Sequence, residues 1–200
     1  VAYVSDAGTP GISDPGYVLV DHAIAHGIRI VPVPGVSAVV AALSVSGLPA
    51  DPFIFYGFLP SKSSSRKKFL QSVAEETKTF ALYESPKRLM AALCDIESVL
   101  GDRRVVVVRE LTKVFEEILR GTVSSVIRTL QERTIKGEIT IIIAGKKRIP
   151  PSCSDNDIRA RLEHLRSRTD LSRRDIIEKL AHDMGIPRKR AYRIVINHDG

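Results

Sequence analysis

Short apolar runs alternate with helical patterns over the first 145 residues of this 200-residue chain. Runs rich in valine, isoleucine, phenylalanine and tyrosine, bounded by glycine, proline or aspartate, are typical of buried strands. They predict strands at Val1–Ser5, Ile28–Val33, Phe53–Tyr56, Thr79–Tyr83, Val105–Arg109 and Ile139–Ile143. The segments between them predict helices at Gly16–His26, Ser37–Ser46, Arg66–Glu76 and Pro86–Leu100. Such alternation predicts an α/β architecture with largely parallel strand pairing.

Two breaks divide this pattern into domains. The stiff segment Leu48–Pro52 separates two α/β halves, and the two prolines within residues 146–156 prevent a strand or helix from continuing there. Beyond the second break the pattern is helical only, with one helix from Leu171 to Met184 and another from Pro187 to Ile196. We therefore expect α/β domains at residues 1–48 and 53–145, a linker at 146–156 and a small C-terminal helical domain at 157–200.

The composition excludes several classes of protein. A hydrophobic content of 44% is too high for a disordered chain, and no segment has the roughly 20 consecutive apolar residues of a membrane span. Two cysteines exclude a disulfide framework and a four-cysteine zinc site. Because no signal peptide opens the chain, a cytoplasmic location is expected. The chain opens on Val1, within a predicted strand, and we expect it to continue a longer polypeptide.

The net charge of +7 is unevenly distributed along the chain. Residues 1–145 carry 16 basic and 15 acidic side chains, whereas residues 146–200 carry 14 and 8, a balance of +6. Such asymmetry suggests a polyanionic partner for the basic segment. A solvated, charge-rich helical tail is the alternative.

A loop of turn-forming residues, Ser5–Gly16, follows the first predicted strand directly and precedes a helix. In parallel sheets, ligands bind beyond the carboxyl ends of strands, where such loops converge. The loop lacks the lysine of a nucleotide P-loop and does not match G-x-G-x-x-G. Asp14 and Pro15 read as N-cap and first helical residue. Pro34–Ala38 repeats the arrangement after the next predicted strand, so a ligand site is favoured over two tight turns.

These two loops, together with Tyr83–Arg88, Arg109–Lys113 and Gly137–Ile139, resemble the tetrapyrrole methylase superfamily, and within it the methyltransferases of small-subunit ribosomal RNA. The resemblance implies two α/β domains with a cleft between them that binds S-adenosylmethionine. It also implies methylation of a cytidine ribose 2′-oxygen in 16S ribosomal RNA, with that RNA or the 30S subunit as partner. The superfamily begins with a further strand and a Gly-Thr-Pro-Ile-Gly-Asn loop. Nothing upstream of Val1 corresponds to them, so we expect the first domain to be incomplete.

Matching the motifs residue by residue implies a set of cofactor-binding positions. They are Ala7, Gly8, Thr9, Ile12, Ser37, Ala38, Tyr83, Glu84 and Leu111.

Candidate catalytic residues are Glu110, Lys87 and Lys113, with Glu84 beside them. A ribose hydroxyl is weakly acidic, so a base that takes its proton or a cation that lowers its pKa would assist the reaction. Glu110 and Lys113 lie three residues apart, and a structural ion pair between them is the favoured interpretation. No histidine lies in a metal-like spacing, and we predict no metal.

Cations occupy the first turns of predicted helices, where they oppose the helix dipole. Free N–H groups together with several cations form a phosphate site, which predicts contacts with RNA phosphates. The predicted RNA-binding residues are Lys62, Arg66, Lys67, Lys68, Lys87, Arg88, Arg173, Arg174, Arg188, Lys189, Arg190 and Arg193. The C-terminal members suggest a helix-turn-helix unit on RNA, a dimerisation element or a plain capping bundle.

Two other functions stay open at this stage. One is methylation of a small, tetrapyrrole-type molecule, which would not need the basic tail or the cationic helix starts. The other is a non-catalytic RNA-binding remnant. A homodimer is also a possible assembly, and no membrane partner is expected.

Overall fold

The computed structural model describes residues 1–6, 8–147, 154–167 and 171–197. The chain divides into two compact units, residues 1–146 and 147–200, and each is described by itself. No helix among the described residues is long and apolar enough to cross a membrane. Most of the predicted linker lies outside the described residues.

The first unit is built on a five-stranded sheet with the strand order β1-β2-β5-β3-β4. Its strands are β1 (Phe53–Phe58), β2 (Thr79–Glu84), β3 (Arg104–Arg109), β4 (Glu117–Thr122) and β5 (Ile139–Ile143). Only β1 and β2 pair in parallel, whereas β5 runs antiparallel to both β2 and β3, and β4 runs antiparallel to β3. The α/β class is confirmed, but the prediction of largely parallel pairing is wrong for these strands.

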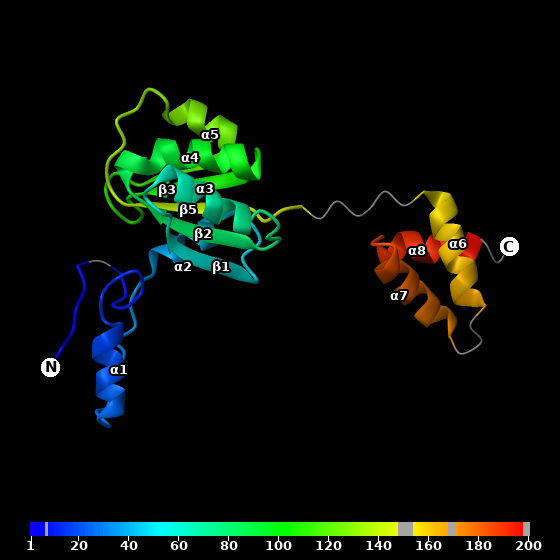
Figure 1. Ribbon diagram of the computed structural model, residues 1–200, viewed down its shortest axis with the longest axis horizontal. Coiled ribbons are helices and arrows are strands. Elements are labelled where there is room, and N and C mark those ends of the chain that lie inside the picture. The colour runs from blue at the N-terminus through cyan, green and yellow to red at the C-terminus, as the bar shows by residue number, and fades with distance from the viewer. Residues whose placement is uncertain (7, 148–153, 168–170, 198–200) are drawn as a thin grey trace. The chain divides into compact units, whose positions relative to one another are not determined.

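Helices cover both faces of this sheet (Figure 1). On one face, α3 (Ser63–Ser72), α4 (Pro86–Leu100) and α5 (Val123–Leu130) pack on side chains that include Phe80, Leu82 and Ile141. On the other face, α2 (Ala38–Ser46) packs through Val39 and Leu43 on a second cluster. Successive strand residues point to opposite faces, so Ala81 and Ile142 belong to that second cluster while their neighbours belong to the first.

Of the first 36 residues, those that the structure describes form one helix, α1 (Tyr17–Ala25), and otherwise turns, bends and irregular backbone. The predicted strands Val1–Ser5 and Ile28–Val33 are wrong. A strand exchanges backbone hydrogen bonds with a neighbouring strand, and no strand of the described residues pairs with either segment. Apolar side chains in this region are exposed to solvent, for example Val4, Val18 and Val33 at 81%, 65% and 88%.

Further elements of the first unit differ from the prediction. The helix predicted at Arg66–Glu76 begins earlier, at Ser63, and ends at Ser72, so that Lys62 is its N-cap. Strand β4 and helix α5 were not predicted. By contrast, the helix predicted at Pro86–Leu100 is confirmed with those bounds.

The second unit contains α6 (Asp155–Arg166), α7 (Arg173–Asp183) and α8 (Arg188–Asn197). Helices α6 and α7 each start with a capping box, in which Ser154 and Ser172 exchange hydrogen bonds with Asp157 and Asp175. The three helices enclose a core of their own. Its fully buried members include Ile158, Leu162, Leu180, Ala191 and Val195.

Candidate active site

The register of the sheet brings the ends of several strands together. Glu84, the last residue of β2, pairs with Ile139 at the start of β5, and Ile139 pairs in turn with Arg109, the last residue of β3. The segments Tyr83–Arg88, Arg109–Lys113 and Gly137–Ile139, which are far apart in the sequence, therefore meet at one end of the sheet. We call it the carboxyl end of the sheet, because β2 and β3 finish there.

Tyr83 connects this end to the N-terminal segments. Its ring packs on Phe55 and Phe58, with centroid distances of 4.9 and 5.5 Å. Burial raises the pKa of Tyr83, a hydrogen bond with the Val39 backbone lowers it, and the carboxylates of Asp14 and Glu138 raise it again, with a net upward shift. The hydroxyl of Tyr83 therefore lies within electrostatic reach of the loop before α1, the start of α2 and the segment before β5.

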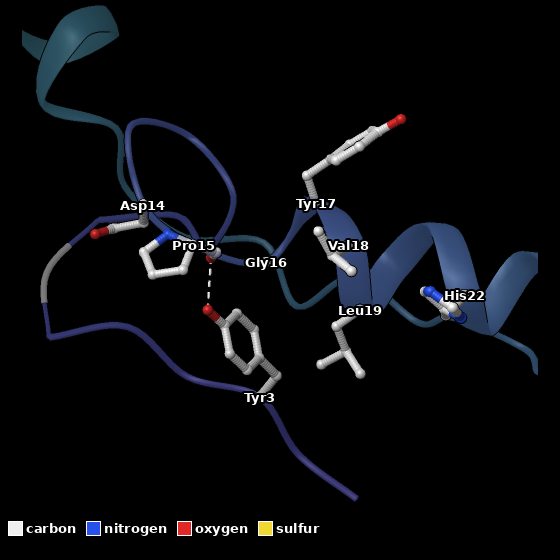
Figure 2. Close-up of a pocket in the computed structure, with 8 residues that line it drawn as sticks. All are labelled: Tyr3, Asp14, Pro15, Gly16, Tyr17, Val18, Leu19 and His22. Carbon is white, nitrogen blue, oxygen red and sulfur yellow. Dashed lines mark hydrogen bonds between the residues drawn. The ribbon is translucent and has the colours of Figure 1, made fainter.

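The loop predicted to bind a cofactor closes over Tyr3, whose hydroxyl donates a 2.5 Å hydrogen bond to the carbonyl of Pro15 (Figure 2). Gly16 is required in this loop, because its φ of +144° suits glycine and a Cβ would lie 3.1 Å from the Tyr3 ring. Gly16, rather than Asp14, is the N-cap of α1, and no side chain caps the helix, which corrects the prediction. An open pocket of about 620 Å³ lies here, and sequence reasoning missed Tyr3, Tyr17 and His22 in its lining.

The residues of the predicted cofactor loop differ in backbone conformation and in exposure. Gly8 has a left-handed φ of +70°, and no atom of the described residues lies within 4 Å of a Cβ placed there. The carbonyl of Thr9 accepts a hydrogen bond of 3.2 Å from the N–H of Ile12, whose side chain is 51% exposed. Ala7 lies outside the described residues. The backbone at Gly8 is thus accessible to a ligand.

The second predicted cofactor loop leads into α2. Ser37 is the N-cap of α2, although its side chain makes no capping hydrogen bond, and Ala38 is exposed. The next residue, Val39, packs in the same apolar cluster as Tyr83 and Leu111. The structure therefore brings predicted cofactor residues from three segments around one cluster.

Glu84 is buried at the end of β2, with a side chain that is 0% exposed. Its Oε1 accepts hydrogen bonds of 2.7 Å from the N–H of Ser85 and from Nε of Arg88. Its Oε2 has no hydrogen-bond partner within the described parts of the chain. Arg88 also donates a 3.4 Å hydrogen bond to the carbonyl of Leu59, which ties the start of α4 to the segment before α3. Arg88, which the sequence predicts to contact RNA, thus binds the buried carboxylate of Glu84 and the backbone of Leu59.

The loop after β3 holds the predicted catalytic pair in strained backbone. Glu110 and Thr112 have φ values of +49° and +67°, which are uncommon for residues with a side chain. Oε1 of Glu110 accepts a 2.8 Å hydrogen bond from the N–H of Glu138 and a 3.1 Å bond from Nζ of Lys113. Lys113 also reaches Oε2 of Glu138 at 3.0 Å. The predicted ion pair between Glu110 and Lys113 is confirmed.

These contacts shift both ionisable groups toward their charged forms. The hydrogen bond from the Glu138 backbone, followed by the one from Lys113, lowers the pKa of Glu110. Hydrogen bonds to Glu138 and Glu110 raise the pKa of Lys113. Backbone strain that the surroundings maintain is found preferentially at functional sites. The third catalytic candidate, Lys87, is exposed in the first turn of α4.

The predicted phosphate contacts at the start of α3 divide into buried and exposed groups. Arg66 is 3% exposed, and its Nε and Nη2 lie 2.7 and 2.6 Å from Oδ2 of Asp95 on α4. We therefore withdraw Arg66 from the RNA-binding set, because its charge is neutralised inside the protein. Lys62 and Lys68 are exposed, whereas Lys67 lies 3.4 Å from Oδ1 of Asp95 with its side chain 47% exposed.

Comparison with known proteins defines the class of this molecule. The family model for tetrapyrrole (corrin/porphyrin) methylases matches residues 1–127, and the chain belongs to this family of methyltransferases. Among solved structures, the methyltransferase CobJ superposes with a TM-score of 0.50 at 18% identity, over 72% of this chain and 65% of that one. This likeness shows the fold alone.

Curated relatives narrow the class. The chain is 43% identical over 196 residues to "Ribosomal RNA small subunit methyltransferase I" of Synechocystis sp., covering 97% of this chain and 70% of the relative. It is 41% identical over 197 residues to the protein of that name from Halalkalibacterium halodurans, covering 97% and 68%. The chain thus spans about two thirds of the length of these relatives.

Within the described residues, no group of three or more histidine, cysteine, aspartate or glutamate side chains is arranged to hold a metal ion.

Proposed function

We propose that this chain belongs to a methyltransferase that uses S-adenosylmethionine to methylate a cytidine ribose 2′-oxygen in 16S ribosomal RNA of the small subunit. The observation that carries the proposal is the meeting of three motif segments at the carboxyl end of the sheet, where Glu84, Ile139 and Arg109 pair across β2, β5 and β3. The names of the two relatives support RNA as the substrate.

The residues around Tyr83 suit the proposed cofactor chemically. S-adenosylmethionine supplies an electrophilic methyl group on a positively charged sulfur. The carboxylates of Asp14 and Glu138, both within electrostatic reach of Tyr83, favour a cation there. Leu111 and the Tyr83 ring offer apolar surface for an adenine, and the open backbone at Gly8 allows a close approach. We propose that the cofactor-binding residues implied by the motifs, Ala7 among them, form this binding site.

The exposed cations at the starts of α3 and α4 suit an RNA backbone. Lys62 is the N-cap of α3 and Lys87 lies in the first turn of α4, and the hydrogen bond between Arg88 and the Leu59 carbonyl holds these two helix starts together. Lys68 is exposed in the second turn of α3. A small tetrapyrrole-type substrate would not require these cations. They therefore favour a phosphodiester polyanion.

In this proposal, most of the rate enhancement comes from orienting the methyl donor and the ribose hydroxyl. Orientation of two reactants supplies on the order of 7–11 kcal/mol, whereas a general base supplies about 10²–10⁴-fold. Glu110 is held by Lys113 and by the Glu138 backbone, which keeps it ionised and oriented. We propose that Glu110 and Lys113 shape the loop after β3. We also propose that Lys87, which is exposed and follows Glu84 by three residues, faces the substrate.

Two measurements on the 200-residue chain test this function. Isothermal calorimetry with S-adenosylmethionine measures cofactor binding, and transfer of a radiolabelled methyl group to small-subunit ribosomal RNA, followed by nucleoside analysis, measures the reaction. Cofactor binding with label on a cytidine 2′-oxygen supports the proposal.

Other outcomes select other functions. RNA binding without cofactor binding identifies a non-catalytic RNA-binding remnant. Label on an added porphyrinoid but not on RNA identifies a small-molecule methyltransferase. Either result overturns the proposed function.

A further inference from the structure

An open groove of about 590 Å³ crosses the second unit between α7 and α8. Four of its lining residues are cations, two from α7 and two from α8, and the other two are apolar or aromatic. They are Arg173, Arg174, Ile177, Arg188, Lys189 and Tyr192.

The cations of the two helices are held together by one carboxylate. Oε1 of Glu178 lies 3.3 Å from Nε of Arg174 and 3.4 Å from Nη2 of Arg188. The side chains of Arg174 and Arg188 nevertheless stay 78% and 63% exposed. Arg174, Arg188 and Lys189 are all exposed, and two of these three cations share the one carboxylate of Glu178, so positive charge exceeds negative charge among these four side chains. This excess attracts an anion while Glu178 fixes the positions of the arginines.

An exposed aromatic ring lies beside these charges. Tyr192 is 54% exposed on α8, one helical turn after Arg188, whereas Ile177 on the opposite side of the groove is 7% exposed. Exposing a tyrosine ring costs hydrophobic burial, which a flat ligand stacked on the ring would restore. The motifs of the sequence give Tyr192 no role.

We propose that this groove binds an unpaired nucleotide of an RNA strand, with the base stacked on Tyr192 and the flanking phosphates on the cations. The inference rests on the proposed function, since it names the form in which the second unit takes the RNA substrate. Sequence-tolerant single-strand sites combine a basic groove with aromatic stacking platforms in this way. A duplex keeps its bases stacked inside the helix and offers no face to Tyr192, and an acidic peptide would use the cations alone.

The test compares three variants of the full chain at one position. Tyr192→Phe keeps the ring, Tyr192→Leu keeps apolar volume without a flat ring, and Tyr192→Ala removes both. Binding of a fluorescein-labelled decauridine is measured by anisotropy at several salt concentrations, with circular dichroism as a check of folding. Stacking of one base predicts that the Leu and Ala variants bind about 5- to 100-fold more weakly, and that the Phe variant binds like the wild type.

The charged residues give a separate readout. Removing Tyr192 changes no charge, so the slope of log affinity against log salt should stay as in the wild type. Arg188→Gln and Lys189→Gln should each reduce that slope by about 0.7, the value for one single-strand phosphate contact. If removal of Tyr192 changes the slope while the two glutamine substitutions leave it unchanged, Tyr192 lies outside the contact with RNA.

Three results would overturn the inference. Equal decauridine affinity of the wild type, Leu and Ala variants removes Tyr192 from the site while leaving the proposed function intact. Equal or tighter binding of a duplex, insensitive to Tyr192→Ala, assigns the groove to duplex RNA. A wild-type chain that binds neither RNA form contradicts this inference and the proposed RNA substrate together. Cofactor binding by calorimetry then decides separately whether the methyltransferase site exists.

Discussion

Arg66 on α3 and Asp95 on α4 form a buried ion pair that joins two helices on the same face of the sheet. Nε of Arg66 donates a 2.7 Å hydrogen bond to Oδ2 of Asp95, and Ser63 donates another of 3.0 Å to the same oxygen. Nη1 of Arg66 donates hydrogen bonds to the carbonyls of Pro60 and Ser61 at 3.4 and 3.1 Å. The segment between β1 and α3 is thus fixed by the same guanidinium.

Asp95→Ala is expected to lower the free energy of unfolding by about 3–5 kcal/mol, because it leaves a buried guanidinium without its counter-charge. Urea denaturation followed by circular dichroism measures the loss. Glu75→Ala is the matched control, since the Glu75–Lys146 pair is 83% and 49% exposed and such pairs contribute about 0–1 kcal/mol. Equal losses in the two variants would show that burial of the pair has no energetic consequence.

The same pair predicts a dependence of stability on pH. Burial raises the pKa of Asp95, but hydrogen bonds from Arg66 and Ser63 and the Arg66 charge lower it more, so that the net pKa lies below its ordinary value of 3.8. A depressed folded-state pKa stabilises the protein above the unfolded pKa and loses that contribution as the pH falls through the folded value. The free energy of unfolding should therefore fall below about pH 4. Asp95→Asn should flatten this acid limb, and parallel curves for the two proteins would contradict the assignment.

The pattern of the sequence predicted those elements whose signal is local. Pro86 after Ser85 and Gly101 after Leu100 mark both ends of α4, and the structure has the same bounds. β4 was missed because its residues Glu117–Thr122 alternate too little to resemble a strand, and it is stabilised by pairing with β3. α5 carried a usable signal, since Val123, Val126 and Leu130 recur at helical spacing and are all buried.

For the candidate site too, the sequence predicted the features with a local signal and missed those that depend on distant residues. Motif spacing indicated which segments form it, and the ion pair between Glu110 and Lys113 followed from a separation of three residues. Strand direction was not predictable in this way, because β3 and β5 are continuous apolar runs buried on both faces, a pattern typical of parallel strands, although the two strands pair antiparallel. Nor did the sequence reveal that Arg66 is buried, since its partner Asp95 lies 29 residues further along the chain.

Gly145 is expected to tolerate no side chain, for reasons of space alone. A Cβ there would lie 2.0 Å from the carbonyl oxygen of Thr77 and 2.7 Å from the N of Lys78, both backbone atoms that cannot rotate away. Gly145→Ala should destabilise the chain by about 1–3 kcal/mol in urea denaturation. Gly35→Ala serves as the control, because nothing lies within 4 Å of its Cβ. It should stay within about 0.5 kcal/mol of the wild type, and similar losses in both variants would refute the steric explanation.

Gly8 and Gly27 offer a matched pair for the proposed cofactor loop. Their φ values are +70° and +64°, and both have open space around a Cβ, so alanine brings the same strain to each. Strain of about 1–2 kcal/mol in a loop that must keep this backbone to bind its ligand weakens affinity about 5- to 30-fold. Calorimetry should show that loss of S-adenosylmethionine affinity for Gly8→Ala and a change of no more than about twofold for Gly27→Ala. Equal effects would separate the loop from the cofactor.

Lys87 is exposed in the first turn of α4, directly after β2, and Lys68 is exposed in the second turn of α3, whereas Lys78 is exposed directly before β2, at the opposite end of that strand from Lys87. Charge reversal to glutamate changes the net charge equally in all three variants, so any difference between them reports position. Lys68→Glu and Lys87→Glu should each reduce the slope of log affinity against log salt for single-stranded ribosomal RNA fragments by about 0.7, through loss of one phosphate contact. Lys78→Glu should keep the wild-type slope. If the three variants lose affinity alike, net charge rather than a defined path for the RNA governs binding, and the cationic helix starts lose their proposed role.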